Sequence, residues 1–399
     1  MKALQKKLLS VLAVCVLLIL VAVGVHRNSS FGADEDKVAT TEVPESVEAA
    51  KKSAYQSAET DLIFWYGDAT YTEFFEKAAL DYYEETGTKV SVQCKDTLDY
   101  IGEIYDETMQ DGSFPDVYLI SGDNLEEAYL YGLVSVNEKG LGEVNVAENA
   151  RYAATYNDKL LGYPLSYNTC VFVYQTDYFT VAPESLQSII DYSNENEPAE
   201  NVEYLLEWDV NDAFYDFPFV SNSVMFEKTE PEVLNVVYDE ELYQKDLEYF
   251  EGILESFSVD ADKVSEESII ENFRNGRTLS AIIDTNSLYK LSGYGYSLME
   301  IPNLNEELPA YSCAITDMIL VNDFSREGKR AADFAYFVTV AMADELHELS
   351  GHYSVIPSGN PDWVEQVAYD SYESAVPIPD SVDAKDFWVY LEETISKYF

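Results

Sequence analysis

Basic side chains are scarce in this sequence of 399 residues, which has 24 lysines and arginines against 74 aspartates and glutamates. The formal net charge is −50, and because four basic residues and no acidic ones precede Asp34, the rest of the chain is near −54. Such a charge repels nucleic acid and anionic lipid headgroups, so we expect no nucleic-acid partner and contact with the membrane only through the N-terminal segment. The charge is typical of a very soluble protein, and attraction of cationic ligands is the alternative interpretation.

Histidine is also rare, with only three in the chain. His26 adjoins an apolar segment, and His347 and His352 are five residues apart. Two imidazoles on one helix face need a spacing of four. The sequence therefore predicts a solvated helix end at these two histidines and no metal site.

Motifs of nucleotide-binding and hydrolytic enzymes are missing. The sequence has no nucleophile elbow, phosphate loop or dinucleotide fingerprint. Asp209–Asp212 loosely resembles a calcium loop, but Phe214 stands where glycine is required and no glutamate closes the loop. We expect no catalytic residue, no cofactor and no metal. With 74 carboxylates the sequence cannot single out a glycosidase pair, so a glycoside-processing enzyme stays an alternative.

The cysteines show no pattern of a disulfide framework or a metal site, because the four residues, Cys15, Cys94, Cys170 and Cys313, have unrelated spacings. Three of them lie outside the apolar N-terminal segment. We expect free and mostly buried thiols, and one disulfide among those three stays open.

The N-terminal segment has the pattern of an export signal. Lys2, Lys6 and Lys7 precede an uncharged run at residues 8–25, which as a helix would be ~27 Å long. The positive flank predicts a cytoplasmic N-terminus and an exported remainder. Residues 1–27 are therefore a signal peptide or a signal anchor. An uncleaved anchor is favoured because the run is long and lacks a small-x-small cleavage site, and Cys15 lacks the context of a lipidation site.

Residues 28–60 are rich in serine, alanine and glutamate and are predicted to be a flexible linker. The body after them shows regular alternation of element types. Leu62–Tyr66 is an apolar strand, residues 74–83 have helical periodicity, and residues 90–92 alternate as a strand. Another buried strand at residues 117–121 is followed by a helix. This order predicts an α/β fold with a parallel sheet between helices.

The ordered motifs resemble those of extracellular solute-binding proteins of bacterial ABC importers, in the maltose-binding branch. They are the aromatic strand tip, Glu85-Thr86-Gly87 before a strand, Pro115-Asp116-Val117, and Gly132-Leu133-Val134. Weaker matches continue to residue 357, with a first crossing between lobes near residues 156–179. The resemblance implies a two-lobe periplasmic-binding-protein-like fold of type II, each lobe a sheet flanked by helices, with a ligand cleft between the lobes.

By this resemblance, residues 61–165 and 285–340 form the N-terminal lobe, and residues 166–284 and 341–399 form the C-terminal lobe. The implied function is binding of a carbohydrate, an oligosaccharide in particular, by hinge closure. The implied partners are the permease subunits and ATPase of an importer at the extracellular face of the cell membrane. Two alternatives remain, a cationic ligand such as a polyamine in the same fold and a membrane-tethered sensor.

Candidate ligand-binding residues come from strand ends, because ligands of open α/β sheets bind outside the carboxyl ends of the strands. Aromatic faces stack on sugar rings, and carboxylates and amides bond to sugar hydroxyls. The candidates are Tyr66, Asp68, Tyr71, Ser121, Asp123, Tyr167, Asn168, Trp208, Asp284, Asn286 and Tyr353. By resemblance, Asp123 matches a ligand-bonding aspartate, Asn168 stands where a glutamate is common, and Ile120 replaces a tryptophan of the maltodextrin-binding proteins.

Each candidate also has a structural alternative. The tyrosines and Trp208 can be ordinary packing residues, and Asp123 can cap the helix that follows it. Asn168 can pack in the crossing segment, and Asp284 and Asn286 can form a turn.

Overall fold

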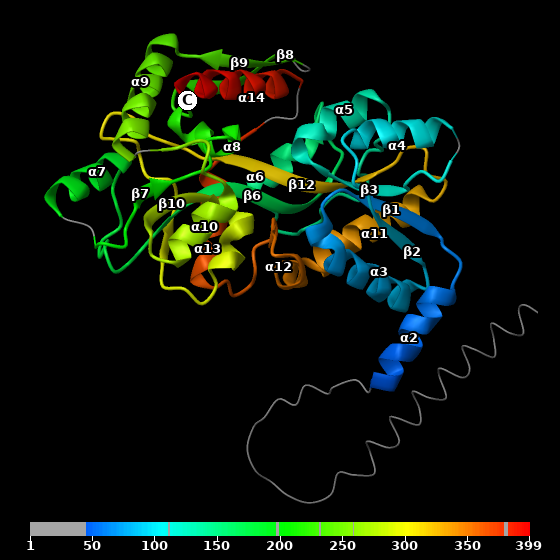
Figure 1. Cartoon of the computed structure of the whole chain (residues 1–399). Coiled ribbons are helices and arrows are strands. Elements are labelled where there is room, and N and C mark those ends of the chain that lie inside the picture. The colour runs from blue at the N-terminus through cyan, green and yellow to red at the C-terminus, as the bar shows by residue number, and fades with distance from the viewer. Residues whose placement is uncertain (1–44, 111, 197–198, 231–232, 258, 379–381) are drawn as a thin grey trace, which may run out of the picture. The chain divides into compact units, whose positions relative to one another are not determined.

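Residues 51–399 form one compact unit of the computed structural model, which describes the chain from residue 45 onward except residues 111, 197–198, 231–232, 258 and 379–381 (Figure 1). Among the described residues no helix is long and apolar enough to span a membrane, and the predicted export segment lies outside them. The helices are α2 (Glu45–Ser57), α3 (Thr72–Thr86), α4 (Tyr100–Met109), α5 (Leu125–Leu130), α6 (Glu148–Ala153), α7 (Leu186–Glu195), α8 (Ala213–Asp216), α9 (Glu240–Phe257), α10 (Glu266–Arg274), α11 (Gly328–Tyr336), α12 (Leu346–Ser350), α13 (Trp363–Ser374) and α14 (Val382–Ile395).

A mixed sheet runs through the described residues in the order β2-β1-β3-β12-β6-β10-β7, with β11 and β13 also paired to β6 and β14 to β12. Its strands are β1 (Leu62–Tyr66), β2 (Val90–Cys94), β3 (Val117–Ser121), β6 (Tyr163–Tyr174), β7 (Tyr204–Glu207), β10 (Thr278–Asp284), β11 (Ser297–Met299), β12 (Cys313–Val321), β13 (Tyr353–Ser354) and β14 (Val376–Pro377). Two short hairpins stand apart, β4 (Thr155–Tyr156) with β5 (Lys159–Leu160) and β8 (Val224–Glu230) with β9 (Val233–Tyr238).

The predicted alternation at the start of the body is confirmed. Both β2 and β3 pair with β1 in parallel, and α3, α4 and α5 follow β1, β2 and β3 in turn. Helix α3 ends at Gly87, whose φ of 76° is the left-handed conformation that glycine adopts without a Cβ clash. A side chain at this position would strain the turn into β2.

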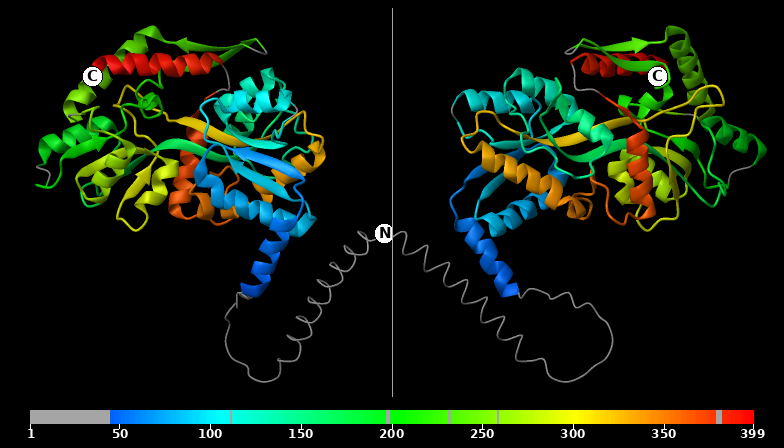
Figure 2. Two further views of the ribbon diagram at one scale, coloured as in Figure 1. Left: turned by 45° about the vertical axis from the view of Figure 1, so that its right-hand side comes forward. Right: turned by 180° about the vertical axis from the view of Figure 1, so that it is seen from behind.

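Helices cover both faces of the sheet around β1 and β3 (Figures 1 and 2). One apolar cluster joins α3 and α11 to β1, with Phe64, Phe75 and Phe334 fully buried. A second cluster joins α4 and α5 to the other face through Tyr118 and Ile104. Burial of each such side chain stabilises the fold by about 1.5–3 kcal/mol.

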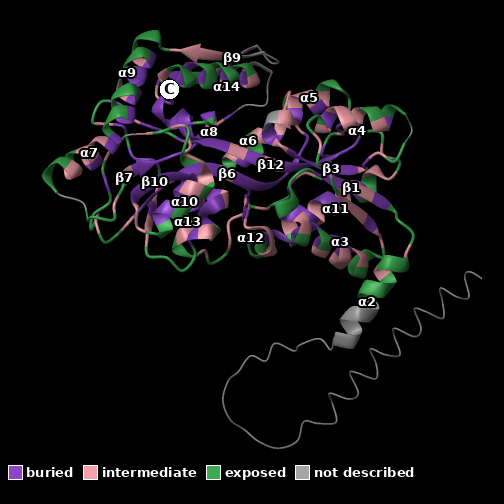
Figure 3. Cartoon of the chain, in the orientation of Figure 1, coloured by how far each residue is buried: buried purple, intermediate pink, exposed green. Residues whose placement is uncertain are grey.

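Strand β6 is the longest of the sheet and continues into the half formed by β10 and β7. There its side chains alternate between two further clusters. Cys170 and Phe172 pack toward α8, α9 and α14, whereas Val171 and Val173 pack toward α10 and α13. Figure 3 shows the strands of this part buried between exposed helix faces. A strand covered on both faces holds its side chains in a fixed direction, which matters for the site below.

The predictions for the linker and for the cysteines have different outcomes. The linker prediction is wrong for residues 45–57, which form α2; this segment has no glycine or proline, and Tyr55 packs edge-on against Tyr83 at 5.5 Å. Cys94, Cys170 and Cys313 are free thiols as expected, although Cys94 is exposed.

Candidate ligand-binding site

Carboxyl ends of strands from the two halves of the sheet meet along β6. At the end of β3, Ser121 pairs with Asp317 of β12, and Asp317 pairs with Ser166 of β6. At the end of β10, Asp284 pairs with Cys170 of β6. These two points on β6 are four residues, or roughly 13 Å, apart. Asn168 lies midway between them and on the same face, since side chains alternate along a strand.

Asn168 links β6 to the end of β10. Its Nδ2 donates to Asp284 Oδ2 at 2.9 Å, and its Oδ1 accepts from Thr285 Oγ1 at 2.9 Å. The other carboxylate oxygen, Asp284 Oδ1, is buried without a hydrogen-bond partner among the described residues, and so is Asn286 Oδ1. Burial raises the pKa of Asp284, while the nearby Ser287 and Asn168 side chains oppose that rise. The Ser287 hydroxyl itself donates to Glu266.

His352 lies beside Asn168, because the next residue, Tyr353, pairs with Tyr167 in antiparallel register. The ring is 5% exposed and stacks on Tyr71 at 4.0 Å, so the prediction of a solvated helix end is wrong for this histidine. Burial lowers the pKa of His352 to about 4 even though Asp68 lies near it. The imidazole is therefore neutral at pH 7.

Hydrogen bonds around Thr70 define which nitrogen of His352 carries the proton. The Thr70 hydroxyl donates to Asp68 Oδ1 at 2.6 Å, so at the 2.8 Å contact between Thr70 Oγ1 and Nε2 of His352 the imidazole is the donor. The remaining nitrogen, Nδ1, is then an acceptor. It is buried and has no partner among the described residues.

Three buried acceptors thus lack donors, two at the carboxyl end of β10 and one just before β13, and we call them the acceptor cluster: Asp284 Oδ1, Asn286 Oδ1 and His352 Nδ1. An unsatisfied buried polar atom costs about 1–3 kcal/mol. A ligand that presents hydroxyl or ammonium donors would remove that cost. Within the part of the chain that is described, no group of three or more His, Cys, Asp or Glu residues could hold a metal ion.

Other predicted residues lie near this cluster, where they form hydrogen bonds between strands or cap helices. Tyr71 is 1% exposed, and its hydroxyl donates to Asp317 Oδ2 at 2.6 Å and lies 2.6 Å from Ser166 Oγ. Asp68 caps a short 3-10 helix by accepting from the Thr70 amide at 2.8 Å. Ser121 is half-buried at the end of β3. Asp123 follows in a 3-10 turn, and its side chain lies outside the described residues.

Two predicted contacts are core residues instead. Tyr66 is 2% exposed, packs against Phe64 and Phe75, and its hydroxyl donates to Thr72 Oγ1 at 3.1 Å. Trp208 is fully buried, and its Nε1 donates to Asp216 Oδ1 at 2.9 Å. An aromatic residue at a strand end has the same sequence pattern whether it packs inward or faces a ligand.

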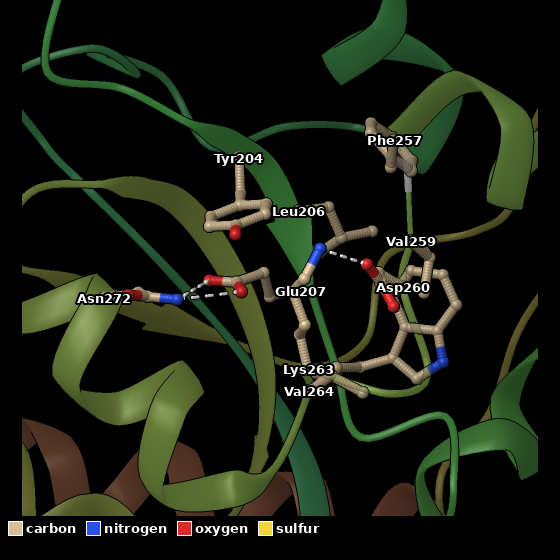
Figure 4. Close-up of a pocket in the computed structure, with 10 residues that line it drawn as sticks. Tyr204, Leu206, Glu207, Phe257, Val259, Asp260, Lys263, Val264 and Asn272 are labelled. Carbon is tan, nitrogen blue, oxygen red and sulfur yellow. Dashed lines mark hydrogen bonds and ion pairs between the residues drawn. The ribbon is translucent and has the colours of Figure 1, made fainter.

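Trp208 lines a small pocket of about 40 Å³, and Figure 4 shows Glu207 and Asn272 pointing toward each other in it. In it Asn272 Nδ2 donates to both carboxylate oxygens of Glu207 at 3.0 and 3.2 Å, and Thr278 also donates to Glu207. Burial raises the pKa of Glu207, which these bonds oppose. Because the Glu207 carboxylate already accepts from Asn272 and Thr278, it needs no donor from a ligand.

We expect Trp208→Phe to destabilise the protein and to leave ligand affinity unchanged. The substitution removes the indole donor and leaves Asp216, which is 1% exposed, with one bond fewer. The expected loss is about 1–3 kcal/mol in the free energy of unfolding. Denaturant unfolding and ligand titration of the same variant test this prediction. A large drop in affinity with unchanged stability would mean that Trp208 contacts the ligand.

Tyr167 and Tyr353 come together, but on the face of β6 opposite to Asn168. Their rings stack at 5.9 Å, and they line a pocket of about 150 Å³. We call it the tyrosine pocket; its lining is Tyr167, Tyr353, Ser354, Pro357, Ser358, Pro361, Glu365, Gln366 and Tyr369. Sequence reasoning missed Thr70, His352, Glu365 and Tyr369. Strand alternation alone could have separated Tyr167 from Asn168.

Comparison with known proteins agrees with this architecture. The family described as "Bacterial extracellular solute-binding protein" matches residues 77–373. A Staphylococcus aureus extracellular solute-binding protein in complex with maltose has a TM-score of 0.69 at 18% identity, covering 86% of this chain and 93% of that one. A cyclo/maltodextrin-binding protein complexed with maltotetraose has a TM-score of 0.72 at 16% identity, covering 86% and 92%.

A Thermus thermophilus maltotriose-binding protein with maltotriose bound has a TM-score of 0.69 at 16% identity, covering 85% of this chain and 94% of that one. No curated protein sequence matches the chain. At these identities the likeness shows the fold, which is the two-lobe α/β fold predicted from the sequence.

Proposed function

Because the chain belongs to the family of bacterial extracellular solute-binding proteins, we propose that it is the substrate-binding component of an ABC importer and that its ligand is a carbohydrate. The acceptor cluster is the observation that carries the proposal. Asp284 Oδ1, Asn286 Oδ1 and His352 Nδ1 are buried and lack donors among the described residues. Sugar hydroxyls are neutral donors of the kind that such acceptors lack.

The ligands of similar structures support the same class, since those proteins are bound to maltose, maltotetraose and maltotriose. The sugar of this protein is a separate question. Ile120, where the maltodextrin-binding branch has a tryptophan, is 3% exposed and packs in the core. A sugar other than a maltodextrin is therefore part of the proposal.

Hinge closure is the proposed mechanism, with β6 and β12 as the crossings between lobes. The N-terminal lobe would hold residues 61–165 and the segment of α11, whose Phe334 packs on β1. The C-terminal lobe would hold residues 166–284 and most of residues 341–399, since Met342 and Leu346 pack in the cluster around β1. The segment 285–312, first assigned to the N-terminal lobe, packs with the clusters of the other half through Leu291 and Leu304. A ligand that contacts both lobes stabilises the closed state.

A panel of oligosaccharides tests the proposal through thermal unfolding of the protein. At about 100 times its dissociation constant the right sugar adds roughly 2.7 kcal/mol to the free energy of unfolding through mass action. A shift of at least about a degree is expected for a chain of this size. The carbohydrate proposal fails if no sugar raises the melting temperature while a compound of another class does.

A cationic ligand such as a polyamine is the second candidate. Ammonium groups are donors as well, Asp68 and Asp284 would neutralise them, and the net charge of −50 favours cations. Isothermal titration calorimetry with spermidine and with the sugars separates the two candidates. Heat of binding with a sugar and none with spermidine would rule out the cationic ligand.

The location proposed is the extracellular face of the cell membrane, anchored or secreted, with permease subunits and an ATPase as partners and no enzymatic activity. A membrane-tethered sensor or a glycoside-processing enzyme remains the alternative. Sugar uptake by a deletion strain distinguishes transport from sensing. Recovery of intact sugar after incubation with the protein distinguishes binding from hydrolysis.

A further inference from the structure

The tyrosine pocket lies on the face of β6 that points away from the acceptor cluster. Its walls come from β6, β13, the loop after β13 and the first two turns of α13. Pro357 and Pro361 restrict that loop, and Asp362 caps α13 by accepting from the Glu365 amide at 2.9 Å. The pocket is therefore formed by rigid segments and needs no rearrangement to exist.

Rings cover the faces of the two central tyrosines. Tyr167 stacks on Tyr372 at 4.4 Å and on Tyr353 at 5.9 Å, while Tyr353 also stacks on His347 at 4.2 Å. Tyr369 stands edge-on to Tyr167 at 6.2 Å. With both faces of these two rings covered, the pocket receives ring edges and hydroxyl groups from them.

Hydrogen-bonding capacity in the pocket is largely unused. Among the described residues, no hydrogen bond or ion pair reaches the hydroxyls of Tyr167, Tyr353 and Tyr369 or the carboxylate of Glu365. Gln366 donates through Nε2 to Asp370 at 2.8 Å, which leaves its carbonyl oxygen for another donor. Burial and the neighbouring Asp362 raise the pKa of Glu365.

The charge of the residues lining the tyrosine pocket indicates a cationic ligand. Glu365 is the one ionisable carboxylate that lines the pocket, and the lining contains no lysine or arginine. A primary ammonium has a positive charge and three N–H donors, which match Glu365, a tyrosine hydroxyl and the Gln366 carbonyl. A quaternary ammonium has no N–H group and needs open ring faces, which Tyr167 and Tyr353 do not offer.

We propose that the tyrosine pocket is a second binding site, separate from the sugar site, and that it takes the primary ammonium group of a small organic amine. The site does not depend on the function proposed above, because it shares no side chain with the acceptor cluster. Amine binding and sugar binding can therefore fail independently.

Ligand-observed NMR titration of the full-length protein tests the site with n-butylammonium, n-butanol and tetramethylammonium as probes. n-Butylammonium is expected to bind at least about tenfold more tightly than n-butanol, which has the same chain without the charge. It is also expected to bind more tightly than tetramethylammonium. Equal binding of n-butanol, or tighter binding of tetramethylammonium, would overturn the proposal.

Variants locate the probe. Glu365→Gln should weaken n-butylammonium binding by at least about tenfold, whereas Glu255→Gln, an exposed site on α9 with the same charge change, should leave it unchanged. Tyr353→Phe keeps the ring stack and should cause a smaller loss. Asp284→Asn should retain amine binding. An unaffected Glu365→Gln variant, or loss of amine binding in Asp284→Asn, would contradict a separate site.

Discussion

Asp284→Asn is expected to raise the dissociation constant of the sugar by about tenfold to a hundredfold, the range for a hydrogen bond to a charged group. Asp284 Oδ2 accepts from Asn168 Nδ2 at 2.9 Å, and Oδ1 is left for the ligand. An asparagine here must turn its oxygen toward Asn168 and present an NH₂ group to the ligand. A sugar hydroxyl would then lose its acceptor. Isothermal titration calorimetry on the wild type and the variant measures the change.

Stability of the unliganded variant shows whether the effect is local. Burial raises the pKa of Asp284, so its charge is unfavourable in the folded state at neutral pH. The melting temperature of the unliganded Asp284→Asn protein should therefore not fall. The exposed Asp177→Asn variant is the matched control for loss of one charge. Weak binding together with a large loss of stability would mean that Asp284 holds the fold and does not contact the sugar.

Asp246→Leu is expected to stabilise the protein at pH 7.5. Asp246 lies on α9 with no exposed surface, and neither carboxylate oxygen has a hydrogen-bond partner among the described residues. The nearby Ser223 hydroxyl donates to the Val220 carbonyl at 2.9 Å. Burial raises the pKa of Asp246 to about 6. Compared with the ordinary aspartate pKa of about 3.9, a pKa of about 6 lowers the free energy of unfolding by about 3 kcal/mol at pH 7.5.

The sign of this effect depends on pH. With a pKa of about 6 in the folded state and a lower one in the unfolded state, the folded protein binds more protons between these values. Wild-type stability therefore falls as pH rises through that window, and the cost remains above pH 6. Urea unfolding should show the variant gaining on the wild type by up to about 3 kcal/mol between pH 4 and pH 7.5.

A substitution at an exposed position on the same helix is the control for replacing a carboxylate with leucine. Glu255→Leu removes a carboxylate from the outer face of α9, and its difference from the wild type should change little over the same pH range. If the difference between Asp246→Leu and the wild type is constant from pH 4 to pH 7.5, Asp246 carries no unfavourable buried charge.

Local periodicity was sufficient to predict much of the fold. Strands β1 and β3 have the predicted bounds Leu62–Tyr66 and Val117–Ser121, and α3 contains the predicted helical segment at residues 74–83. Each of these elements is encoded by neighbours in sequence that share one face. The helix at residues 45–57 was missed because its sequence has good helix formers but no apolar stripe.

The candidate site depends on pairings that no local pattern contains. His352 enters it because β13 pairs with the middle of β6, nearly two hundred residues earlier in the chain. Trp208 was predicted as a stacking platform in the second lobe, and its ring is buried. Tyr66 was predicted from its position at a strand end, which places a residue near the site but does not determine the direction of its ring. Asn168 and Asp284 were predicted by the same argument and do meet, at 2.9 Å.

A structure of the protein with the sugar that stabilises it most is the most direct test of the proposed function. Sugar hydroxyls are expected to donate to Asp284 Oδ1, Asn286 Oδ1 and His352 Nδ1, the three buried acceptors that lack donors among the described residues. A sugar bound elsewhere, with these three atoms still without partners, would contradict it.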